Sequence, residues 1–144
     1  MQTITTYLSE YAESHQNHTN QWIHVVCVPL ITWSILGVLH TIKMTDDIHA
    51  SHAFVLFALV YYSFFKRALI VASMALVSAL MLYSFQFIPN LLITAIVVFV
   101  LAWIGQFYGH HVEGKRPSFL KDLTFLLIGP IWILKKAFPK IDSY

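Results

Sequence analysis

The sequence predicts an all-α polytopic membrane protein with four transmembrane helices and an interfacial helix at each end. Hydrophobic residues make up 58% of the chain and charged residues 11%, against about 45–50% and about 25% in soluble domains. Most apolar residues lie in long runs, and a helix needs about 20 residues to cross the hydrocarbon core. These runs lack the alternation of a β-barrel, so helices must pair the backbone amides. A length of 144 residues indicates a single membrane-embedded domain, 1–144.

Four apolar runs define the expected spans, in order Trp22–Leu39, Ala53–Phe65, Ala68–Phe85 and Leu91–Gly109. The second run is short, but Ser51 and His52 before it and a snorkelling Lys66 after it can extend the span. The N-terminal region, 1–21, contains no Lys or Arg. It therefore lacks the basic start of a signal peptide, and we expect it to stay on the mature protein.

The last apolar segment, Phe119–Phe138, is expected to lie in the membrane interface. It contains Lys121 and Asp122 and is interrupted by Gly129–Pro130, which favours a broken amphipathic helix. Basic residues gather on the cytoplasmic side of membrane proteins, and four spans leave only Lys43 outside. The remaining eight are then inside: Lys66, Arg67, Lys115, Arg116, Lys121, Lys135, Lys136 and Lys140. We therefore expect both termini to be cytoplasmic, with a bacterial inner membrane as the expected location.

Charge and cysteine content exclude several classes of function. The formal net charge is +2, and the basic residues are too scattered to form a nucleic-acid-binding face. The one cysteine, Cys27, excludes an internal disulfide and every multi-cysteine metal pattern. Inside the first span it is interpreted as a small apolar residue. Eight histidines in so apolar a chain are the feature that needs an explanation.

The predicted topology sorts the histidines into two groups. His24 begins the first span and His110 ends the fourth, so an even number of spans returns both to one membrane face. His15 lies nine residues before His24, on the opposite side of a straight helix at about 100° per residue. A break between them is required, and the cap and turn formers Asn17–Asn20 provide it, with Asn20 as the expected N-cap.

The end of the fourth span carries further polar residues on one helical face. Trp103, Gln106, His110 and Glu113 follow spacings of three, four and three, whereas His111 points about 100° away. An imidazole and a carboxylate at this spacing can reach one ion. Together with His15 and His24, the residues His110 and Glu113 predict a nitrogen-rich site suited to Fe(II), Mn(II) or Zn(II).

Other readings stay open for several of these residues. Glu113 could instead pair with Lys115 or Arg116. Those two cations fit a basic flank that stops translocation, or an anchor for a substrate. The four histidines that are interpreted as polar interfacial anchors are His18, His40, His49 and His52.

Two motifs carry a family resemblance. The first consists of Tyr11, His15, Asn17, Asn20, His24 and Pro29, and the second of Gln106-Phe107-Tyr108-Gly109-His110 followed by Glu113-Gly114-Lys115 and Pro117. With them the sequence resembles the small membrane proteins related to the yeast 2-hydroxy fatty acid dioxygenase, over nearly the whole chain. By this resemblance His15, His24 and His110 match the histidines that are taken to hold Fe(II). His18 and His111 are not carried over, and the acidic residue near Glu113 shifts by one place among relatives.

The resemblance implies an iron-dependent α-oxidation of a 2-hydroxy fatty acid, with O2 as co-substrate and a fatty acid one carbon shorter as product. A 2-hydroxy acid can bind a metal through its hydroxyl and carboxylate, while open coordination positions admit O2. The lipid bilayer would hold the acyl chain. In this reading Glu113 joins the three histidines as a catalytic residue, and Lys115 and Arg116 bind the substrate.

Two alternatives belong to other classes. A di-iron fatty acid desaturase or hydroxylase also uses membrane helices and histidine clusters, but it needs about eight ligands on one face, and the predicted topology places three histidines on the other. A non-catalytic metal-binding membrane protein would hold the ion without turnover.

Overall fold

The computed structural model describes residues 3–13, 15–114 and 124–143, and in these ranges it contains helices and no strand. The predicted all-α class is therefore confirmed. The helices in chain order are α1 (Ile4–Glu13), α2 (His18–His40), α3 (Ala50–Ser63), α4 (Ala68–Ser84), η1 (Phe85–Phe87), α5 (Leu91–Glu113), α6 (Thr124–Ala137) and η3 (Ile141–Ser143).

Three helical segments are long and apolar enough to cross a membrane. They are His18–His40, Ala68–Phe87 and Leu91–Glu113, and they match the first, third and fourth predicted runs. The helix of the second run, α3, is apolar but has 14 residues, fewer than the about 20 that a perpendicular span needs. The span over the second run, and with it the count of four spans, therefore stays a prediction.

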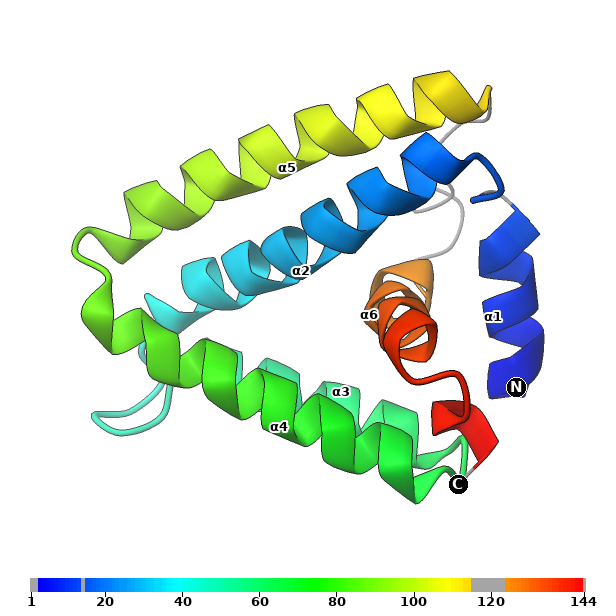
Figure 1. The fold of residues 1–144 in the computed structure, drawn as a ribbon. Coiled ribbons are helices and arrows are strands. Elements are labelled where there is room, and N and C mark those ends of the chain that lie inside the picture. The colour runs from blue at the N-terminus through cyan, green and yellow to red at the C-terminus, as the bar shows by residue number, and fades with distance from the viewer. Residues whose placement is uncertain (1–2, 14, 115–123, 144) are drawn as a thin grey trace.

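Four of the helices form two antiparallel pairs, α2 with α5 and α3 with α4 (Figure 1). The pairs meet at one end and diverge toward the other, where α6 lies between them and α1 packs against α6. Both chain ends and the α3–α4 turn lie at this open end, and the α2–α3 and α4–α5 connections lie at the opposite end. This arrangement brings the start of α2 beside the end of α5, as the predicted order of spans requires.

Small residues allow α2 and α5 to pack closely. A methyl group added to Gly37 would lie 3.1 Å from the Cβ of Ala95, and one added to Gly105 would lie 2.7 Å from the Sγ of Cys27. Gly105 and Gly109 form a G-x-x-x-G pattern, which lets the backbones of membrane helices approach. The interface therefore holds the two helices together along their length.

Large apolar side chains cover the outer faces of α4 and α5. Leu76 and Leu80 are 62% and 60% exposed, and Leu101 and Ile104 are 62% and 60% exposed. Soluble monomers rarely expose contiguous apolar surface on this scale. Together with the membrane-length helices, this surface fits a lipid environment.

The expected break at Gly129–Pro130 is absent, because α6 runs through both residues without interruption. A methyl group at Gly129 would lie 3.1 Å from the Tyr11 hydroxyl oxygen, so this glycine allows α1 and α6 to approach. Pro130 lacks an amide hydrogen, and a helix tolerates such a loss where neighbouring elements support it. The Tyr62 hydroxyl donates to the Leu127 carbonyl at 2.7 Å in the preceding turn. The placement of α1 and α6 in the membrane interface stays a prediction.

Candidate metal centre

Three buried histidines meet at the open end of the fold. One ligand nitrogen each from His15, His24 and His110 lies within 4.8 Å of the other two. The ring centroids are 4.1 Å apart for His15 and His24, 4.9 Å for His24 and His110, and 5.4 Å for His15 and His110. The side chains are 4%, 1% and 6% exposed, respectively. Within the described part of the chain, this is the one group of three or more side chains with the spacing of metal ligands.

The turn between α1 and α2 folds His15 back toward His24. The Asn17 side chain caps α2 by accepting hydrogen bonds from the backbone amides of Thr19 at 2.9 Å and Asn20 at 3.3 Å. The predicted break is therefore present, but its N-cap is Asn17 and not Asn20. Asn20 lies inside the first turn of α2 and is fully buried, since it faces α5 and not the solvent.

Backbone carbonyls orient two of the three rings. The Nδ1–H of His15 donates to the Tyr11 carbonyl at 2.6 Å, and the Nδ1–H of His24 donates to the Asn20 carbonyl at 3.0 Å. A hydrogen bond from one ring nitrogen fixes the tautomer in which the other nitrogen can bind a metal. The Tyr11 ring also stacks on the His15 ring, with centroids 4.2 Å apart and planes 2° from parallel.

The protonation state of His15 and the ring of His110 both fit a metal site. Burial is the main cause that lowers the pKa of His15 to about 4, so this imidazole is neutral at pH 7, as a metal ligand must be. The Nδ1 of His110 is buried and has no hydrogen-bond partner among the described residues. Buried polar atoms rarely lack a partner, and a bound cation would provide one. The donor set therefore fits a divalent transition metal.

Glu113 lies one helical turn beyond His110, but its carboxylate binds the α1–α2 turn. Its Oε1 accepts the backbone N–H of Gln16 at 2.6 Å, and its Oε2 accepts that of Asn17 at 2.7 Å. Glu113 is not part of the close nitrogen group. The two bonds connect the end of α5 to the turn that carries His15, an arrangement that supports a positioning role. Its predicted catalytic role stays a prediction.

Two further histidines near this end, His18 and His111, do not join the group. Lys115 and Arg116 lie outside the described residues, so their predicted role in binding substrate stays a prediction. His111 is exposed. His18 accepts a hydrogen bond from the Trp22 indole N–H at 2.9 Å. Both positions agree with leaving these two histidines out of the ligand set.

The remaining three histidines gather at the opposite end of the helices. His40 and His49 stack with centroids 4.2 Å apart, and the His52 ring lies 5.7 Å from that of His40. His40 Nδ1 hydrogen-bonds to the Ser51 hydroxyl at 2.8 Å, and His52 Nδ1 accepts the His49 backbone N–H at 2.9 Å. These local bonds close the α2–α3 connection and support the interpretation of the three residues as anchors.

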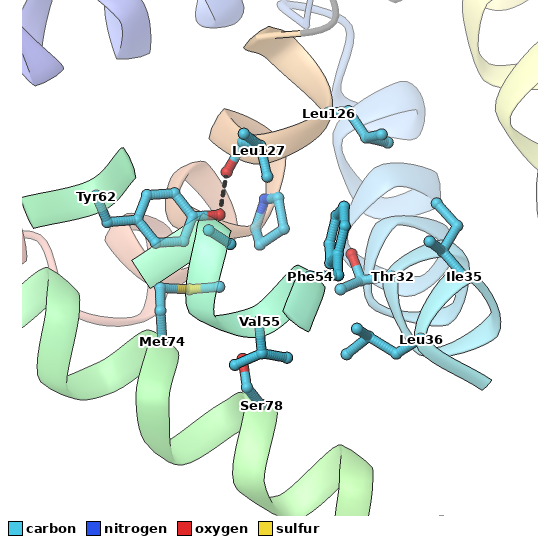
Figure 2. Close-up of a pocket in the computed structure, with 12 residues that line it drawn as sticks. Thr32, Ile35, Leu36, Phe54, Val55, Tyr62, Met74, Ser78, Leu126 and Leu127 are labelled. Carbon is cyan, nitrogen blue, oxygen red and sulfur yellow. Dashed lines mark hydrogen bonds between the residues drawn. The ribbon is translucent and has the colours of Figure 1, made fainter. Parts of the chain in front are cut away.

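Two of the pockets are lined by residues of α2 and α6. An open groove reaches His15 and is also lined by Gln21, Trp132 and Lys136. A second, apolar pocket lies between α2, α3, α4 and α6, with Met74 among its lining residues, and contains none of the three grouped histidines (Figure 2). Sequence reasoning missed Trp132 and Lys136 as residues beside the centre. Their spacing of four predicts only that they share a helix face.

The fold and the site together define an all-helical protein with three apolar helices of membrane-spanning length and a buried three-histidine centre suited to a divalent metal. A family model described as 2-hydroxy-palmitic acid dioxygenase Mpo1-like matches residues 1–141. The chain therefore belongs to the Mpo1-like family, which confirms the resemblance predicted from its motifs. A similar curated protein is the 2-hydroxy-palmitic acid dioxygenase MPO1 of Saccharomyces cerevisiae, 27% identical over 134 residues that cover 91% of this chain and 77% of the yeast protein. No solved structure matches the chain.

Proposed function

We propose that this protein is an Fe(II)-dependent dioxygenase that converts 2-hydroxy fatty acids into fatty acids one carbon shorter at the cytoplasmic membrane face. Membership of the family and the name of the yeast relative support the reaction class. The observation that carries the metal dependence is the convergence of three buried histidine nitrogens within 4.8 Å. Three neutral nitrogen ligands leave coordination positions open, as oxygen-using non-haem iron sites require.

The proposed reaction needs no external reductant. Conversion of a 2-hydroxy acid into the shorter acid and CO2 breaks the C1–C2 bond and releases as many electrons as one O2 accepts. In the overall balance, one 2-hydroxy acid and one O2 give the shorter acid, one CO2 and one water. Bound iron would supply the one-electron and O2 chemistry that amino acid side chains lack.

The residues of the chain hold and orient the centre. His15, His24 and His110 would bind the metal, and their burial excludes bulk water. Glu113 would act by fastening the α1–α2 turn, through its two short hydrogen bonds to backbone amides. Positioning of this kind contributes to rate because a displacement of about 1 Å can cost about 100-fold. The segment that contains Lys115 and Arg116 remains a candidate anchor for the substrate.

The proposed function can be tested on protein purified in a non-ionic detergent. Metal content is measured first, and O2 uptake and the shortened acid are then measured with 2-hydroxypalmitate, with and without added Fe(II). We expect one iron per chain and turnover that depends on it. Iron binding without O2 uptake would instead indicate the non-catalytic metal-binding protein.

The di-iron alternative makes a different prediction, namely two iron ions per chain and turnover of unsubstituted fatty acids. The positions of the histidines argue against a di-iron site. Three of them close the α2–α3 connection at the opposite end of the helices from the candidate metal centre. They are therefore too far away to complete a ligand set of about eight.

A further inference from the structure

A groove at the open end of the fold reaches His15, a candidate metal ligand. It opens between α1, the start of α2 and the end of α6, and Lys136 lines it together with Gln21 and Trp132. A substrate head group that approaches the centre from this side must pass these three side chains. The chemistry of the groove therefore bears on which head groups are admitted.

Both neighbours of the Lys136 ammonium also contact His15. The Nζ of Lys136 lies 3.1 Å from the Oε1 of Gln21 and 4.9 Å from the centroid of the Trp132 ring. Gln21 Nε2 in turn donates to the His15 carbonyl at 2.7 Å, and the Trp132 and His15 ring centroids are 5.3 Å apart. The positive charge is thus one side chain away from a candidate metal ligand.

This ammonium differs from that of its neighbour in the sequence. Lys135 forms an ion pair with Asp142 at 2.8 Å. Lys136 contacts an amide oxygen and an aromatic face, and it makes no ion pair with a carboxylate among the residues that the structure describes. A substrate carboxylate that replaced the amide oxygen would turn this hydrogen bond into an ion pair between opposite charges.

We propose that Lys136 binds the carboxylate of the 2-hydroxy fatty acid in the groove beside His15. The proposal rests on the proposed function, which supplies an anionic head group that must reach the metal. Trp132 is buried, and its ring contacts both His15 and the Lys136 ammonium. Glu13 of α1 also lines the groove.

The kinetic test compares Lys136→Gln with Lys136→Arg, and uses Lys140→Gln as the matched control. Lys140 is exposed on the same C-terminal segment, so its replacement removes the same charge away from the groove. We expect Lys136→Gln to raise the KM for 2-hydroxypalmitate about tenfold, as loss of a hydrogen bond to a charged group predicts. The kcat and the iron content should stay within about twofold of wild type. Lys136→Arg and Lys140→Gln should both keep the wild-type KM.

A binding test needs neither iron nor turnover. Metal-free protein in non-ionic detergent is titrated calorimetrically with palmitate and with hexadecanol, which share a tail and differ in charge. Wild type should prefer palmitate, and Lys136→Gln should lose that preference while it binds hexadecanol unchanged. A Lys136→Gln protein that keeps both the KM and the preference would overturn the proposal, as would an equal loss in Lys140→Gln.

Two further outcomes distinguish the role of Lys136 from the proposed function. A rise in KM confined to Lys115→Gln or Arg116→Gln would assign the carboxylate to the other basic segment and overturn the role of Lys136. If wild type binds iron and prefers palmitate, and Lys136→Gln loses that preference, but wild type does not turn over 2-hydroxypalmitate, the proposed function is refuted and Lys136 remains a carboxylate-binding residue.

Discussion

Adding one methyl group to Gly109 should separate the two helices that carry His24 and His110. The new Cβ would overlap the side chain of Asn20. Asn20 cannot yield easily because it is fully buried at the start of α2. Its carbonyl also orients the His24 ring. The substitution Gly109→Ala therefore strains the backbone at the level of the candidate metal centre.

The size of the effect follows from the packing. Overfilling a well-packed interior typically costs about 1–3 kcal/mol. If that strain falls on the metal-bound state, Fe(II) should bind about 5- to 150-fold more weakly, since each 1.4 kcal/mol is about tenfold in affinity. The affinity is measured by competition with a chelator of known strength, and the stability by thermal unfolding in the same detergent.

Gly37→Ala is the matched control at the other end of the same helix interface. Its added Cβ would lie 3.1 Å from the Cβ of Ala95, and Gly37 is about 20 Å along α2 from His24 at about 1.5 Å per residue. Both variants should unfold at lower temperature, and only Gly109→Ala should lose metal affinity. Equal losses of affinity, or a Gly109→Ala protein with wild-type affinity, would refute this reasoning.

Four further predictions concern the site, the substrate and the topology. His24→Ala should remove most bound iron and O2 uptake while His52→Ala keeps both, and the reverse pattern, read by metal analysis and an oxygen electrode, would exclude the proposed ligand set. Glu113→Ala should lower the free energy of unfolding by about 1.5–3 kcal/mol and weaken iron binding, with Glu113→Gln in between; unchanged affinity in both would argue against a positioning role. Iron-loaded protein should oxidise 2-hydroxypalmitate far faster than palmitate or the 3-hydroxy isomer, and similar rates for the three would contradict a role for the 2-hydroxyl. In a Cys27→Ser background, a membrane-impermeant thiol reagent should label a cysteine placed at Lys43 from outside the cell, and protection from labelling would contradict cytoplasmic termini.

Local patterns were sufficient to predict most of the helices and the gathering of three histidines. Apolar runs define membrane helices because lipid leaves the backbone no other partner. The number of runs between His24 and His110 and the turn formers after His15 were enough to predict that the three histidines meet. Fold class and candidate ligands therefore depended on patterns within segments and on the order of those segments.

Features that depend on contacts between segments were missed. Asn20 resembles an N-cap by type, but its burial against α5 depends on Gly109, far away in the sequence. The continuity of α6 through Pro130 depends on packing against other helices. The partners of Glu113 are backbone N–H donors, and the side-chain types of the residues that provide them carry no signal for such a bond.

The hydrogen bonds of the His15 and His24 rings also bear on how this centre tolerates mutation and how it could be transplanted. Each ring donates to the main-chain oxygen of the residue four positions earlier, and any residue type at positions 11 and 20 supplies that oxygen. The His24 tautomer is thus set by the helical geometry of α2, whereas His15 lies beyond the end of α1 and its ring returns to a carbonyl of that helix. Side-chain changes at positions 11 and 20 can alter packing without removing the acceptor. A designer who grafts the centre onto another scaffold would have to copy the backbone around both acceptors, because three histidines placed at the correct distances would leave their protons unassigned.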